Sequence, residues 1–189
     1  MEKSFNFKLN TSSPLSKSAL DLGLLDFQSV LNYVNQLPYG RNTDRCDYTL
    51  VLKEQKGTCS TKHAFLKQLA IENLQGNITL CLGIYKMNGL NTKGIASVLK
   101  HYNLDYIPEA HCYLKIDNKI IDITRSITSE HSFENSILTE ETILPFQIGD
   151  YKVKIHQTFI KNWIVSEKTK YTFEDLWAIR EACIKALNQ

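Results

Sequence analysis

The stretch from Glu109 to Thr124 restricts the fold most strongly, because it predicts an antiparallel β-hairpin with a defined register. Two runs rich in β-forming residues flank Asp117-Asn118, a pair that suits a tight two-residue turn. A turn of that length pairs Ile116 with Lys119 and fixes the later pairs along the two strands. The sequence thus predicts an antiparallel sheet and which side chains share each of its faces.

This register places chemically different side chains on the two faces of the hairpin. One face is nearly all apolar and carries Cys112, Leu114, Ile116, Ile121 and Ile123. The other face carries His111, Tyr113, Asp122 and Thr124. His111 and Asp122 become diagonal neighbours on that second face, about 7 Å apart at the backbone and within side-chain reach. A three-residue loop would put them on opposite faces, and the apolar alternation favours the two-residue loop.

The stretch from Lys56 to Ala70 predicts a helix that begins at a cysteine. Thr58 is a natural N-cap residue, and apolar residues recur at helical spacing after it. Cys59 therefore lies in the first turn, where unpaired N–H groups and the helix dipole favour thiolate over thiol and can hold a developing oxyanion. A nucleophilic cysteine needs this setting and a base opposite it, whereas most free cysteines are buried parts of a core.

The order of these motifs resembles that of the transglutaminase-like branch of the papain-fold thiol enzymes. The resemblance spans about residues 27–124 and rests on Gly57-Thr58-Cys59 with Ala64 behind it, on Ala110-His111 followed by Tyr113, and on Asp122-Ile123-Thr124. It implies an α+β fold with a papain-like core, in which the helix-start cysteine packs on an antiparallel sheet. It also implies that Cys59 is the nucleophile, His111 the base and acid, and Asp122 the residue that orients His111. The chain departs from the family pattern at Thr58, at Cys112 and at Ile123, which replaces a common proline.

The resemblance implies thiol-dependent acyl transfer on an amide or ester, with no cofactor. Hydrolysis, by a peptidase, an amidase or a deamidase, is the leading expectation because water is the default acceptor. The expected substrate is a peptide, a protein or a small amide. Transfer to an amine is an alternative, and so is a catalytically inactive interaction module that keeps the fold.

Two further residues near the cysteine allow alternative readings. Tyr39 follows a predicted helix, and the resemblance places such an aromatic residue near the site as a substrate contact; otherwise it is a loop aromatic packed on the core. His63 lies one helical turn after Cys59 and can either hydrogen-bond the thiol or join Cys59 and His111 in a zinc site. Because the sequence has no second Cys/His pair with ligand spacing, we expect no metal.

Composition indicates which kinds of partner and which cellular location to expect for the protein. The 189 residues carry a net charge of +2 with no run of Lys or Arg, so nucleic acid is not an expected partner. No apolar run reaches the length of a membrane span, and no signal peptide is visible. Five cysteines without a CxxC pair predict reduced thiols in a cytoplasm. We expect one domain over residues 1–189, with a lead-in segment at 1–25 and a C-terminal helical appendage at 158–189.

Hydrophobic periodicity and capping residues predict the remaining elements. Helices are expected from Asp26 to about Leu37, over Thr92–His101, over Phe159–Val165 and from Thr172 to about Leu187. A buried strand is expected over Ile78–Tyr85, a short strand or extended segment over Tyr48–Leu52, and a hairpin from Thr142–Ile148 to Tyr151–Gln157. The polar segment 125–135, which includes His131, is expected to be a loop.

Overall fold

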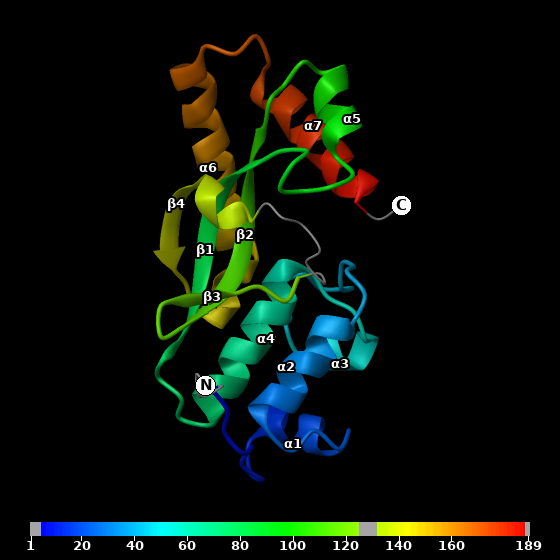
Figure 1. Ribbon diagram of the computed structural model, residues 1–189, viewed down its shortest axis with the longest axis vertical. Helices are drawn as coiled ribbons and strands as arrows, with labels where there is room; N and C mark the ends of the chain where they lie inside the picture. The colour runs from blue at the N-terminus through cyan, green and yellow to red at the C-terminus, as the bar shows by residue number, and fades with distance from the viewer. Residues whose placement is uncertain (1–4, 125–131, 188–189) are drawn as a thin grey trace. The chain divides into compact units, whose positions relative to one another are not determined.

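The computed structural model describes residues 5–124 and 132–187, and this part of the chain has an α+β fold (Figure 1). Its α-helices are α1 (Pro14–Leu20), α2 (Phe27–Gln36), α3 (Leu50–Glu54), α4 (Cys59–Glu72), α5 (Ala96–His101), α6 (Asp150–Glu167) and α7 (Phe173–Ala186). Its strands are β1 (Ile78–Met87), β2 (Ile107–Ile116), β3 (Lys119–Ile121) and β4 (Ile137–Thr142). Two 3₁₀ helices, η1 (Phe133–Ser136) and η2 (Pro145–Ile148), flank β4. The four strands form an antiparallel sheet with the order β3-β2-β1-β4.

The chain divides into two compact units that alternate along the sequence. The first unit comprises Met1–Leu82, Cys112–Ser126 and Thr142–Gly149. The second unit comprises Gly83–His111, Ile127–Glu141 and Asp150–Gln189. The predicted nucleophile Cys59 and the predicted orienting residue Asp122 belong to the first unit, and His111 belongs to the second.

Helix α4 forms the centre of the first unit, where α1, α2, α3 and η2 all contact it (Figure 1). Ten of its fourteen residues are buried, so the helix is covered on nearly all sides. Four of these are polar, Ser60, Thr61, Lys62 and His63, and a buried lysine is especially rare. The Lys62 ammonium donates a hydrogen bond of 2.6 Å to the carbonyl of Leu37, the residue that ends α2, where a cation also complements the helix dipole.

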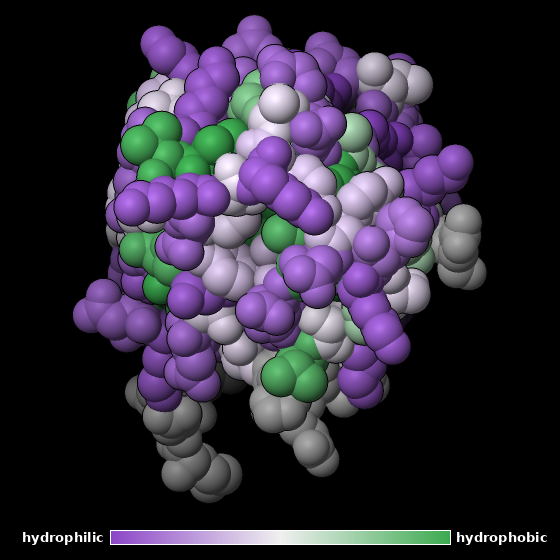
Figure 2. All heavy atoms as spheres, turned by 90° about the horizontal axis from the view of Figure 1, so that it is seen from above, coloured by the Kyte–Doolittle hydropathy of each residue, from purple (hydrophilic) through white to green (hydrophobic). Residues whose placement is uncertain are grey.

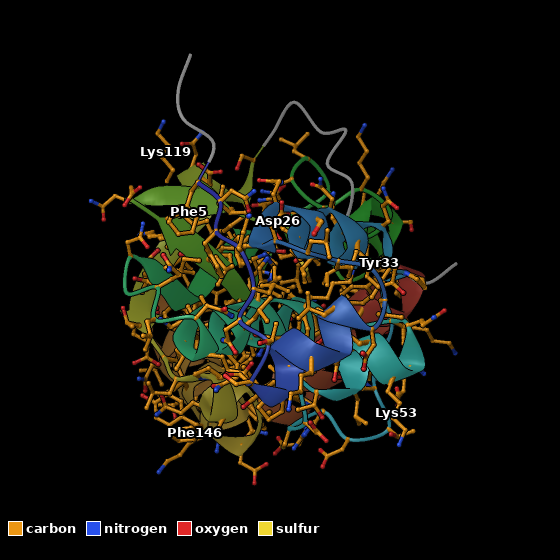
Figure 3. All side chains as sticks on the ribbon, turned by 90° about the horizontal axis from the view of Figure 1, so that it is seen from below. Phe5, Asp26, Tyr33, Lys53, Lys119 and Phe146 are labelled. Atoms are coloured by element: carbon orange, nitrogen blue, oxygen red, sulfur yellow. The ribbon has the colours of Figure 1, made fainter. Side chains whose placement is uncertain are left out.

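Three helices begin at capping boxes, each at a position where the sequence predicts a helix start. Each N-cap side chain accepts a backbone N–H of the first turn, and the residue three positions later bonds back to the N-cap. The pairs are Asp26 with Ser29, Thr58 with Thr61, and Thr172 with Asp175. Asp26, labelled in Figure 3, lies at the start of α2. The starts of α2, α4 and α7 are therefore confirmed.

The predicted hairpin is also confirmed, with the predicted register. Ile116 pairs with Lys119, and Leu114 pairs with Ile121. Both turn residues have positive φ, 48° at Asp117 and 66° at Asn118, a conformation that Asn and Asp tolerate better than other residues with side chains. Strand β3 ends at Ile121, so Asp122 lies immediately beyond the paired residues.

In the second unit, α7 contacts both α5 and α6 (Figure 1). Aromatic side chains join these helices to the segment that leads into β2. The indole N–H of Trp163 donates to the Tyr106 hydroxyl at 2.9 Å, and the Tyr171 hydroxyl donates to the Tyr102 carbonyl at 2.6 Å. Buried Leu176, Ile179, Cys183 and Ile184 form the inner face of α7.

The sequence prediction is wrong between residues 142 and 157. Instead of a hairpin, η2 leads directly into the long helix α6, and the strand is β4, which lies earlier in the chain. The alternation of polar and apolar residues from Tyr151 to Gln157 resembles a strand, but burial follows a helical spacing at His156, Ile160 and Trp163. Helix α6 also begins eight residues before the predicted C-terminal appendage.

Two shorter segments also differ from the prediction, and α5 is shorter than expected. Residues 50–54 form α3 instead of the predicted strand or extended segment, and the lead-in segment contains α1. The side chain of Ser13, the N-cap residue of α1, makes no capping hydrogen bond. The Glu72 carboxylate of α4 instead accepts the N–H groups of Leu15 and Ser16 at 3.2 and 3.1 Å, so the cap comes from a distant residue. Most of the predicted loop at 125–135, including His131, lies outside the described residues.

None of the described helices is both long enough and apolar enough to cross a membrane. Figure 2 shows a face covered largely by hydrophilic residues, with small, separate hydrophobic areas between them. Single exposed apolar side chains, such as Phe146 (labelled in Figure 3) at 70% exposure, are normal on protein surfaces.

Candidate functional site

Cys59 is the first residue of α4, and a chain of hydrogen bonds fixes the start of this helix. The Thr58 N–H donates to the Thr61 hydroxyl at 3.0 Å, and that hydroxyl donates to the buried side-chain oxygen of Asn42 at 2.8 Å. Cys59 is 7% exposed, and its sulfur lies 3.8 Å from the Ser60 hydroxyl. The thiol therefore occupies a rigid first turn, at the positive end of a 14-residue helix.

The backbone just before Cys59 runs beside the segment that carries Tyr39. Tyr39 and Gly57 form a parallel bridge. The Gly57 N–H donates to the Pro38 carbonyl at 3.2 Å, and the Gly40 N–H donates to the Gly57 carbonyl at 3.1 Å. The structure thus brings half-buried Tyr39 next to the residue two positions before Cys59. Its contact with a substrate stays a prediction.

We expect Gly57→Ala to destabilise the protein by about 1–3 kcal/mol, because the site leaves no room for a methyl group. A Cβ at Gly57 would lie 2.9 Å from Lys62 Cγ and 3.0 Å from the Thr61 hydroxyl, and hydrogen bonds hold both side chains. Urea unfolding measures the change. Gly76→Ala is the matched control, since no atom lies within 4 Å of a Cβ there. Equal stability of the two variants would contradict this packing.

His63 connects α4 to the segment that follows β3. The imidazole is fully buried. Its Nδ1 lies 2.7 Å from the Cys59 carbonyl oxygen, and its Nε2 accepts the backbone N–H of Ile123 at 3.0 Å. A carbonyl oxygen can only accept, so Nδ1 carries the proton and Nε2 presents its lone pair. These two contacts define a neutral ring in the Nδ1–H tautomer.

Asp122 lies in the turn that His63 contacts, and its side chain has 10% exposure. Its Oδ1 accepts the backbone N–H of Thr124 at 2.9 Å and the Thr124 hydroxyl at 2.5 Å. The same Oδ1 lies 3.6 Å from Nε2 of His63. We do not regard these two groups as an ion pair, because Nε2 is the acceptor for Ile123 and carries no proton. Asp122 is thus held beside His63 by the fold of its own turn.

His111 lies on β2 in the second unit, where it is 9% exposed. Its ring packs edge-on against two aromatic rings, Tyr85 of β1 with centroids 5.9 Å apart and Phe133 of η1 with centroids 4.7 Å apart. Neither aromatic residue stands out in the sequence as a candidate for the site. Cys112, the next residue along β2, is fully buried, as expected for a core residue.

Two of the three predicted catalytic residues, Cys59 and Asp122, lie in one unit and flank the same buried imidazole. Cys59 and Asp122 are joined through His63, which bonds to the carbonyl of one and to the N–H that follows the other. His111 lies on the strand whose far end pairs with β3 in the predicted register. The hydrogen bonds of His111 to Asp122 and to the Cys59 sulfur stay predictions.

The contacts of His63 bear on its alternative roles as a base for Cys59 and as a zinc ligand. Either role requires a ring nitrogen with a lone pair directed at the thiol or the metal. In the structure Nδ1 is a donor to a carbonyl, and the lone pair of Nε2 accepts Ile123. Across residues 5–124 and 132–187 there is no group of three or more His, Cys, Asp or Glu residues that could hold a metal ion.

Comparisons with known proteins add no assignment to this site. The chain matches no protein-family model, and searches of curated proteins and of solved structures found no match either. The resemblance to the transglutaminase-like enzymes therefore rests on the sequence motifs around Cys59, His111 and Asp122.

Proposed function

We propose that the protein is a thiol-dependent acyl-transfer enzyme with a papain-like, transglutaminase-like core, and that it hydrolyses an amide or ester. The catalytic residues are Cys59, His111 and Asp122. The substrate is a peptide, a protein or a small amide, and water is the acceptor. An amine acceptor would give a transglutaminase reaction instead.

The observation that carries this proposal is the connection of Cys59 to Asp122 through His63. The two residues are 63 positions apart in the sequence and belong to separate motifs. His63 bonds to the backbone carbonyl of Cys59 and to the backbone N–H of Ile123, and its Nε2 lies 3.6 Å from Oδ1 of Asp122, so the two candidate residues flank one buried imidazole. The capped helix start supports the same proposal, since it supplies the N–H groups that a thiolate and an oxyanion need.

The hairpin register supports the place of His111 in the proposal. The observed pairs are those of the two-residue turn, and the next pair in that register is Tyr113 with Asp122. If this register continues past Ile121, His111 is the diagonal neighbour of Asp122 on the same face. The turn that carries Asp122 follows directly after the last observed pair.

In the proposed reaction, His111 takes the proton of the Cys59 thiol, and the thiolate sulfur bonds to the substrate carbonyl carbon. The oxyanion that forms is stabilised by N–H groups at the helix start. His111 then gives its proton to the leaving amine or alcohol as the bond from carbon to that group breaks. Water attacks the resulting thioester with His111 as base, which releases the acid and restores the thiol. Asp122 holds the imidazole in the required tautomer throughout.

Alkylation with iodoacetamide over a range of pH, followed by mapping of the adducts, tests the proposal. We expect Cys59 to react faster near neutral pH than the other four cysteines, despite its burial. Cys46 is the informative comparison because it is exposed, and Cys183 should react slowly because burial raises its pKa to about 11. Faster labelling of any other cysteine in the folded protein would contradict the assignment of Cys59 and favour an inactive interaction module.

A further inference from the structure

We infer that His63 is a positioning residue for the proposed reaction: it ties the turn that carries Asp122 to the helix turn that carries Cys59. The inference rests on the proposed function, and it assigns to His63 a role that is neither base nor metal ligand. It follows from three features of His63, which are its burial, the direction of its two hydrogen bonds and the chemistry of its two partners.

Two backbone atoms adjacent to proposed catalytic side chains hydrogen-bond to the ring of His63. Nδ1 donates to the carbonyl of Cys59 itself. Nε2 accepts the N–H of Ile123, which directly follows Asp122. The imidazole is a short rigid ring, so its two nitrogens hold these backbone segments at a nearly fixed separation. A shift of the turn relative to the helix would have to break one of the two hydrogen bonds.

Burial makes the hydrogen bond to Ile123 costly to lose. His63 is fully buried and Ile123 is 3% exposed, so water has little access to either group. A buried N–H without an acceptor costs about 1–3 kcal/mol, which favours the arrangement in which the turn stays attached. The Asp122 carboxylate, which already bonds to Thr124 within the same turn, is carried along with it.

A matched pair of substitutions separates the two hydrogen bonds. The side-chain amide of Asn at position 63 lies about as far from the backbone as Nδ1 of histidine. It can still donate to the Cys59 carbonyl, but it is too short to reach Ile123. Gln is one methylene longer and brings its amide oxygen to the position of Nε2, where it can accept the Ile123 N–H. His63→Asn therefore removes the tie to the turn, and His63→Gln restores it.

The readout is the pH profile of Cys59 alkylation, alongside thermal unfolding of each variant. If Asp122 no longer orients His111, the imidazolium that pairs with the thiolate is less stable. We expect His63→Asn to move the profile about one pH unit higher, which is about a tenfold loss of rate near pH 6. His63→Gln should recover most of that loss. His101→Asn, at an exposed histidine in the last turn of α5, is the control and should match the wild type.

The tautomer of His63 provides a second measurement that does not need a variant to fold. Long-range ¹H–¹⁵N correlation spectra of the wild type should show the Nδ1–H tautomer for His63 at neutral pH. An Nε2–H tautomer would overturn the inference. So would a pH profile for His63→Asn that matches the wild type while the melting temperature falls, since that result describes a purely structural residue.

Failure of the inference and failure of the proposed function give different results. If wild-type Cys59 is the fastest thiol but both His63 variants keep its profile, the function stands and the positioning role is wrong. If wild-type Cys59 shows no enhanced reactivity, the proposed function itself is wrong, and the positioning role is overturned with it.

Discussion

Asp122→Asn is expected to slow acylation of Cys59 by about 10²–10⁴-fold while leaving the fold nearly unchanged. An asparagine keeps the side-chain oxygen that accepts the N–H and the hydroxyl of Thr124, so the turn should stay folded. What it loses is the negative charge that, in the proposed triad, fixes the tautomer of His111 and stabilises its protonated form. The rate is measured as the burst of product released from an activated ester.

Asp47→Asn is the matched control for this experiment. The Asp47 carboxylate accepts the N–H of Thr49 at 2.8 Å and its hydroxyl at 2.6 Å, so Asp47 and Asp122 make the same turn. The control therefore removes one charge from an equivalent turn elsewhere in the first unit. We expect it to acylate at the wild-type rate. If Asp122→Asn also acylates at that rate, Asp122 does not orient the base.

Arg180→Met is expected to lower the free energy of unfolding by about 3–5 kcal/mol, because it leaves a buried carboxylate without its main partner. Glu109 of β2 is buried, and both of its oxygens accept from the Arg180 guanidinium of α7, at 2.7 and 2.5 Å. Nε2 of His156 in α6 lies 3.9 Å from Oε2 of Glu109. This cluster ties the two long helices of the second unit to the strand that carries His111.

The pairing of Glu109 with Arg180 should also make the stability of the protein depend on pH. Burial alone would raise the pKa of Glu109, but the charge and hydrogen bonds of Arg180, with smaller effects from His156 and Lys152, lower it from 4.5 to about 2. A carboxyl whose pKa is lowered by folding contributes stability above its unfolded pKa and loses it in acid. The wild type should therefore lose up to about 3 kcal/mol from this group as the pH falls from about 4.5 to about 2.

Unfolding in urea at several pH values tests both effects. In Arg180→Met, the charge that lowers the pKa of Glu109 is gone and burial still raises it. The loss of stability in acid should therefore shrink or reverse. The double variant Glu109→Met, Arg180→Met has no buried charge and should recover most of the stability of the wild type at neutral pH. A single variant as stable as the wild type, with the same acid dependence, would contradict the assigned role of this pair.

The hairpin shows how much of the fold local sequence could predict. Its turn needs two residues that tolerate positive φ, and Asp117-Asn118 are such residues. The apolar alternation then fixes the register, because a shift by one residue would turn the apolar side chains to the other face. The helix starts at Asp26, Thr58 and Thr172 were predictable for the same reason, since each capping signal lies within four residues.

Features that depend on distant residues were not predictable in this way. Helix α1 is capped by Glu72, and α6 is distinguished from a strand only by which of its residues the rest of the second unit buries. Glu109 and Arg180 are 71 residues apart. His63 could be noticed because it is one turn from Cys59, but its bond to Ile123 spans 60 residues, and no local pattern carries that information.

The central claim is tested most directly by a crystal structure of the protein with a covalent inhibitor on Cys59. The account predicts that one imidazole nitrogen of His111 lies at hydrogen-bond distance, about 2.7–3.2 Å, from a carboxylate oxygen of Asp122. The other imidazole nitrogen should point towards the sulfur of Cys59. His111 and Asp122 on opposite faces of the sheet, or a Cys59 sulfur far from His111, would contradict the triad.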